Sequence, residues 1–218
     1  MNTIRRWMLI GFMIASVMPL IHAEEPATRA GEDIAKSLME AVAASQMAVE
    51  NSRTICPAAI RTWADGLKPS SPEVSAQLQK IAETLGAMPD KISPTDQRVQ
   101  SAPTPKMEPL AYARYMCPRW LISWAESLQE EGRKGDCAIV AQNSQVLSGT
   151  FLAELGGAVD PNLSNIKAYT QAMVKAAGAQ ADSCLTGSPE SAAAAEQAKD
   201  EALRLQQAVQ LDSTAQPL

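Results

Sequence analysis

The stretch CPAAIRTWADGL at residues 56–67 returns as CPRWLISWAESL at residues 117–128. The two copies align without a gap and share Cys, Pro, Trp, Ala and Leu. Their apolar residues recur at the spacing of one helical face, which predicts that Trp63 and Trp124 pack into a core. Proline suits the first position of a helix, so each copy predicts a new helix that begins beside its cysteine. Packing and capping explain every shared position, and we interpret the motif as architecture.

Apolar residues at helical spacing continue on both sides of the motif, and no segment has the pattern of a strand. Ser71 followed by Pro72 is a typical helix start. The sequence predicts an all-α fold, a disulfide-braced helical bundle of about six to eight helices. The expected helices cover residues 31–53, 56–67, 72–88, 109–117, 118–131 and 137–156, with C-terminal helices over 161–211.

The similarity between the two halves extends beyond the motif. Residues 74–82 (VSAQLQKIA) match residues 139–147 (IVAQNSQVL) loosely. We therefore predict an internal duplication, with repeat units over 31–88 and 107–155 inside a single helical domain, 24–218. The proline-rich stretch 89–106 predicts a loop between the units.

The first residues have the pattern of a secretory signal peptide over 1–23. Arg5 and Arg6 precede an apolar run, and Ala23 provides a small residue at the cleavage site. The apolar run is shorter than the roughly 20 residues that span a bilayer. We expect a periplasmic or secreted protein with no stable membrane insertion after cleavage.

Charge and histidine content exclude several classes of function. Two of the 19 basic residues lie in the predicted signal peptide, which leaves 17 against 24 acidic residues, a net charge of −7. Lys and Arg form no cluster, so no nucleic-acid partner is expected. The one histidine, His22, also lies in the signal peptide, so a mature chain would have no imidazole for a catalytic triad or a metal. We predict no cofactor and no metal site.

The four cysteines predict two disulfides, for which three pairings exist. Cys137 begins, and Cys184 ends, a predicted antiparallel helical hairpin, so these two should lie side by side. The helix after Cys117 would hold it about 20 Å from Cys137, beyond the roughly 7 Å that a disulfide allows. The pairs expected are therefore Cys56–Cys117 and Cys137–Cys184. A metal site built from four thiolates is the alternative, which an oxidising compartment disfavours.

Tyr112, Tyr115, Trp120 and Trp124 hold most of the mature chain's aromatic side chains within thirteen residues. Such a cluster predicts a binding surface for a ligand or a protein partner, because Trp and Tyr are favoured at interfaces. The alternative is that these side chains belong to the core.

We expect a helical binding or accessory protein that contacts another protein, as an envelope or secretion-system component, an inhibitor or an immunity protein. No catalytic residue is predicted. One alternative is a hydrolase of cell-wall glycan that uses a carboxylate pair, for which Asp65 and Glu126 occupy equivalent positions in the repeat. Another is a carrier that binds a small ligand on the aromatic cluster.

Overall fold

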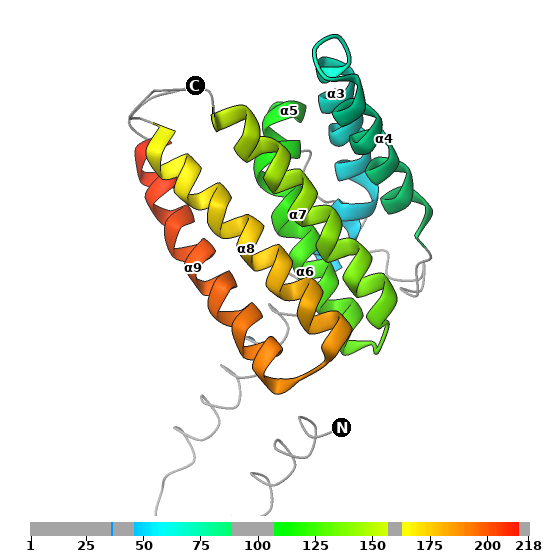
Figure 1. Cartoon of the computed structure of the whole chain (residues 1–218), viewed down its shortest axis with the longest axis vertical. Coiled ribbons are helices and arrows are strands. Elements are labelled where there is room, and N and C mark those ends of the chain that lie inside the picture. The colour runs from blue at the N-terminus through cyan, green and yellow to red at the C-terminus, as the bar shows by residue number, and fades with distance from the viewer. Residues whose placement is uncertain (1–35, 37–45, 89–106, 157–162, 214–218) are drawn as a thin grey trace, which may run out of the picture. The chain divides into compact units, whose positions relative to one another are not determined.

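The computed structural model describes residues 36, 46–88, 107–156 and 163–213, and these ranges are helical with no strand (Figure 1). The all-α, disulfide-braced helical bundle is confirmed. The α-helices are α3 (Cys56–Leu67), α4 (Pro72–Ala87), α5 (Pro109–Ala111), α6 (Cys117–Glu130), α7 (Lys134–Gly156), α8 (Ser164–Thr186) and α9 (Pro189–Ser213). Two π-helical turns, η1 (Asn51–Ile55) and η3 (Tyr112–Met116), directly precede α3 and α6.

Several predicted features lie outside the described residues. These are the signal peptide at 1–23, the proline-rich loop at 89–106, and most of the helix expected over 31–53. Among the residues that are described, no helix combines the length and the apolar character needed to cross a bilayer.

The prolines of the two motifs do not begin separate helices, which corrects the expectation from capping. The residue before α3, Ile55, and the residue before α6, Met116, are already helical. Proline lacks an N–H, and its ring clashes with the carbonyl four residues earlier. In each copy the preceding turn is π-helical, so the cysteine N–H reaches the carbonyl five residues back, that of Asn51 or Tyr112. Each helical run therefore continues through its Cys-Pro pair by widening one turn.

The two motifs meet at a disulfide. Cys56 and Cys117 are bonded, with their Cα atoms 5.6 Å apart. Contacts around the bond are reciprocal, because α3 packs on η3 while α6 packs on η1. Each motif helix also packs on the helix that follows it, α3 on α4 and α6 on α7. The two copies thus share their local structure, while the duplication itself stays a prediction.

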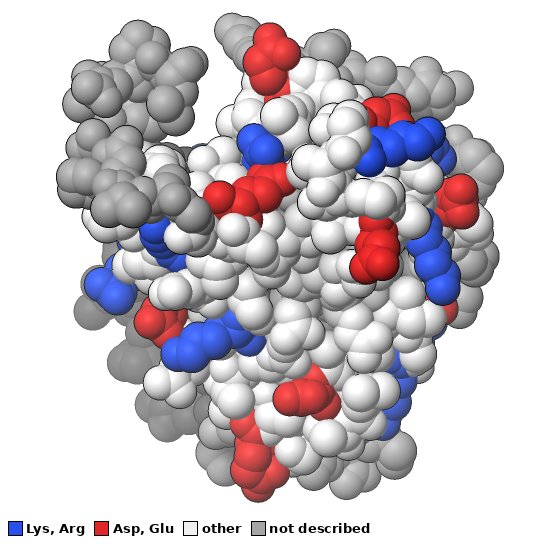
Figure 2. Space-filling view, turned by 45° about the horizontal axis from the view of Figure 1, so that its top comes forward, with Lys and Arg blue, Asp and Glu red and all other residues white. Residues whose placement is uncertain are grey.

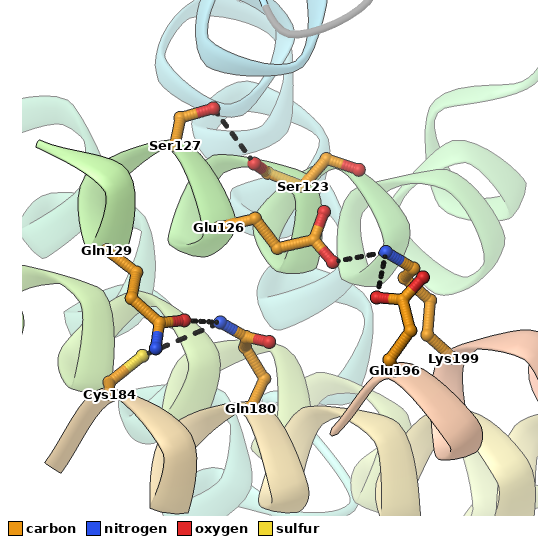
Figure 3. Close-up of polar contacts among 8 residues, drawn as sticks. All are labelled: Ser123, Glu126, Ser127, Gln129, Gln180, Cys184, Glu196 and Lys199. Carbon is orange, nitrogen blue, oxygen red and sulfur yellow. Dashed lines mark hydrogen bonds and ion pairs between the residues drawn. The ribbon is translucent and has the colours of Figure 1, made fainter. Parts of the chain in front are cut away.

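A second disulfide joins Cys137, near the start of α7, to Cys184, near the end of α8, with Cα atoms 5.7 Å apart. Both pairs are those expected from helix geometry. Beside this bond, the Gln180 amide donates to the side-chain oxygen of Gln129 at 2.7 Å (Figure 3). Gln129 in turn donates to the hydroxyl of Ser183 at 3.0 Å. This amide network links α6 to α8 next to the covalent bond.

The core has two parts. The larger part lies among α3, α4, α6 and α7 and contains both motif tryptophans. The smaller part joins α6, α8 and α9 and is rich in alanine, with Ala172, Ala176 and Ala202 buried. Small side chains let helices approach closely, which explains why α9 lies along α8 (Figure 1). The side of α9 that carries Ala202 therefore faces the same bundle.

The turn after α6 depends on glycine. Gly132 has φ of 76°, a left-handed conformation that side chains with a Cβ rarely adopt. The N–H of Arg133 reaches the carbonyl of Leu128, and that of Gly132 reaches Gln129, which is the Schellman pattern of helix termination. This turn directs the chain from α6 back into α7.

Candidate binding groove

The predicted aromatic cluster is divided between core and surface. Tyr112 and Trp124 are buried, with 5% and 2% of their surface exposed. Trp120 is half-buried, and its indole N–H donates to the hydroxyl of Tyr112 at 3.0 Å. Burial raises the pKa of Tyr112, although the bond from Trp120 lowers it. Of the four residues, only Trp120 lines the groove described below.

The half-buried Tyr115 belongs to a cluster that ties the two motifs together. Its ring meets Phe151 edge-on, with centroids 4.9 Å apart, and burial raises its pKa. The neighbouring Arg114 lies over the rings of Trp63 and Phe151, at 5.7 and 5.5 Å from their centroids. Glu154 accepts from the Trp63 indole at 2.8 Å and pairs with Arg114 at 2.7 Å. These contacts satisfy polar groups within the bundle and leave little of the cluster for a ligand.

A groove of about 190 Å³ lies where α6, α8 and α9 meet, and we call it the α6–α8–α9 groove. Its apolar lining comes from all three helices. Its polar lining consists of Arg119, Ser123, Glu126, Tyr169, Lys199 and Gln206. The volume is close to the roughly 150 Å³ of a cavity that holds benzene. One apolar side chain of a larger molecule could therefore fit.

Most of the charge in this groove is balanced internally. Lys199 of α9 pairs with Glu126 of α6 at 2.7 Å and with Glu196 at 2.9 Å (Figure 3). Burial lowers the pKa of Lys199, but its hydrogen bonds to the two carboxylates outweigh burial and leave the pKa raised. Lysine therefore stays protonated and holds α9 against α6.

Among the described residues, neither Arg119 nor Tyr169 has an ion-pair or side-chain hydrogen-bond partner in the groove. Arg119 is half-buried and forms no ion pair within the described part of the chain. Tyr169 is 4% exposed. No described group forms a hydrogen bond with its hydroxyl, and this oxygen keeps some accessible surface. Burial raises its pKa to about 12, while the nearby Arg119 charge lowers it. A half-buried cation and a neutral hydroxyl donor thus both line the groove with their hydrogen-bonding capacity unused.

The groove exists on one repeat and not on the other. In α6, Arg119, Ile122 and Glu126 face α8 and α9, and Ile122 is 4% exposed. At the matching places of α3 stand Ala58, Arg61 and Asp65, which are all exposed. The hairpin α8–α9 therefore covers an outer face of α6, and its counterpart on α3 faces solvent.

Sequence reasoning missed Arg119, Tyr169 and Lys199. A signal was present in the repeat, because an apolar residue at position 122 replaces the Arg61 of the first copy. An apolar residue on the outer face of a motif helix indicates a further packing partner. It does not indicate which helices cover that face, so the groove could not be located.

The hydrolase alternative has no support from the placement of its acids. Asp65 is exposed on α3 and does not line the groove, whereas Glu126 lines it and is bound to Lys199. Among the described residues, no group of three or more His, Cys, Asp or Glu is placed to hold a metal ion.

Comparison with protein families, with curated proteins and with solved structures finds no significant match to this chain. Its function is consequently argued from the geometry of the groove.

Proposed function

We propose that this protein is an exported, non-catalytic binding protein, periplasmic or secreted, that holds another protein at the α6–α8–α9 groove. The observation that supports this proposal is that Arg119, Trp120 and Tyr169 line one groove. Arg, Trp and Tyr are the residue types that contribute most binding free energy at protein interfaces. Here they surround a concave, partly apolar surface that can receive a side chain of a partner.

The scaffold suits such a role. The two disulfides tie α6 to α3 and α8 to α7, so two of the three helices that line the groove are each bonded to a neighbouring helix. A site whose walls are fixed before binding loses less conformational entropy when a partner arrives. Disulfides also persist in oxidising compartments, which supports export.

The charge distribution favours a protein partner of mixed character over a polyanion. In the face shown in Figure 2, Lys and Arg side chains are interspersed with Asp and Glu, and no block of one sign dominates. Polyanion binding requires a clustered basic surface. A protein-binding site usually has a polar rim around a centre with fewer charges.

Photo-crosslinking from two exposed leucines tests the proposal. Leu203 lines the groove and is 43% exposed, whereas Leu185, at the end of α8, is 59% exposed and lies outside it. A benzophenone amino acid is placed at one position or the other, and the oxidised protein is produced in its own host and irradiated. We expect a discrete cross-linked species from position 203, absent from position 185 and reduced by Arg119→Gln. Equal labelling at both positions, or none at 203, contradicts the proposal.

A further inference from the structure

The unused groups in the groove indicate the chemistry of the missing partner. Partial burial of an arginine without a counter-ion is unfavourable, because the charge loses hydration and gains no carboxylate. Arg119 is in this situation, while the other cation of the lining, Lys199, already has two carboxylates. Proteins accept such local costs mainly at functional sites. Among the described residues, Arg119 therefore has no anionic partner of its own, because both nearby carboxylates are held by Lys199.

The Tyr169 hydroxyl further restricts the class of anion, because the anion must also accept a hydrogen bond from a neutral donor. The hydroxyl of Tyr169 is a donor, and its raised pKa keeps it protonated at neutral pH. A guanidinium and a phenol together match a carboxylate, whose two oxygens accept up to about four hydrogen bonds. The apolar lining, which includes Ile122, Met173 and Leu203, lies in the same small groove.

The size of the groove requires the carboxylate and an apolar group to be close together. At about 190 Å³ it can hold one side chain of moderate size, not an extended segment. An aspartate or glutamate side chain would bring a carboxylate but leave the apolar lining empty. The last residue of a polypeptide, if apolar, carries its α-carboxylate on the same carbon as its side chain.

We infer that the α6–α8–α9 groove binds the C-terminal residue of a partner polypeptide, with the α-carboxylate on Arg119 and Tyr169 and an apolar side chain against the apolar lining. This inference rests on the proposed function and names the part of the partner that enters the groove. Capture of a terminal carboxylate is a known mode of peptide recognition.

Isothermal titration calorimetry with three probes tests this. The probes are acetyl-Ser-Ala-Ala-Leu with a free carboxylate, the same peptide with a C-terminal amide, and 4-methylpentanoate, which carries the same isobutyl group and carboxylate without a peptide. Each is titrated into the oxidised wild type, Arg119→Gln, Tyr169→Phe and Arg61→Gln. The last variant is the control, because Arg61 is an exposed arginine on the equivalent helix α3.

We expect the free-acid peptide to bind at least about tenfold more tightly than the amide. Arg119→Gln should weaken it about 10- to 100-fold and abolish the preference for the acid, and Tyr169→Phe should weaken it a few-fold. Arg61→Gln should match the wild type. Each variant should unfold at the same temperature as the wild type, which would show that the loss of peptide binding is a local effect.

Four results overturn the inference. Equal binding of acid and amide, or an acid preference that survives Arg119→Gln, shows that the groove does not recognise a carboxylate through Arg119. If 4-methylpentanoate binds as tightly as the peptide, the site recognises a free small acid. If no probe binds while position 203 still cross-links a partner, the inference fails and the proposed function stands. If no probe binds and position 203 cross-links nothing, both the inference and the proposed function fail.

Discussion

Replacing Tyr169 by phenylalanine should make the protein more resistant to alkali. Burial raises the pKa of Tyr169 to about 12 from 10.0, so the folded state favours the neutral phenol. Its contribution to stability is fully present below pH 10 and is lost as pH rises toward 12. At pH 11 an unfolded tyrosine is roughly 90% ionised and the folded one roughly 10%. The wild type should then lose about 1.4 kcal/mol through this residue between pH 8 and pH 11.

The assay is urea denaturation of the oxidised wild type and of Tyr169→Phe at pH 8 and pH 11, followed by circular dichroism. At pH 8 the two proteins should agree within about 0.5 kcal/mol, because the deleted hydroxyl has no partner in the described structure. At pH 11 the variant should be the more stable by about 1.4 kcal/mol. Lys199 also loses stabilising charge as pH rises through its raised pKa, but it does so in both proteins and cancels in the difference. Parallel pH dependence in the two proteins would refute the assignment of Tyr169 as a buried, neutral phenol.

Two further predictions concern the scaffold. Gly149→Ala should raise the free energy of unfolding by about 0.5–1 kcal/mol, because it replaces a mid-helix glycine in α7, whereas Gly132→Ala should lower it by about 1 kcal/mol through its left-handed φ. An added Cβ meets no atom within 4 Å at either site, so urea denaturation that gives both changes the same sign would contradict the backbone argument. Removing the first disulfide with the double substitution Cys56→Ala and Cys117→Ala should cost about 4 kcal/mol, because the bond closes a loop with a sequence separation of 61; thermal unfolding checks this, and a loss below about 1 kcal/mol would show that the unfolded chain is already restricted there.

Much of the fold could be predicted because its determinants are local. Apolar periodicity placed α4, α6 and α7 within a few residues of their observed bounds. The expected helical hairpin, together with the distance along one helix, was enough to pair the cysteines. The path of the chain through Pro57 and Pro118 could not be predicted in the same way. A proline at the start of a helix and a proline just after a π-helical turn have the same sequence signature, and tertiary packing of the two motifs decides between them.

The binding site was harder to predict than the fold, because its residues are brought together by packing between distant helices. Tyr112, Tyr115 and Trp124 were predicted to form a binding surface because they are large aromatic residues. In the bundle, Tyr112 and Trp124 are buried in the core, and Tyr115 is half-buried against Phe151. Arg119 and Tyr169 lie 50 positions apart and belong to no motif. Only the crossing of α8 over α6 places them in one groove.

The comparison between the two motifs indicates why the groove is more than a packing defect. If α8–α9 had covered α6 for stability alone, an apolar or small residue at position 119 would have served. Arginine at that place brings a charge that no described carboxylate neutralises, although Lys199 in the same groove has two. Packing of α8–α9 on α6 does not require an arginine without a described counter-ion at position 119. The proposed binding of an external carboxylate would explain the arginine, and loss of the acid preference in Arg119→Gln is the measurement that tests this explanation.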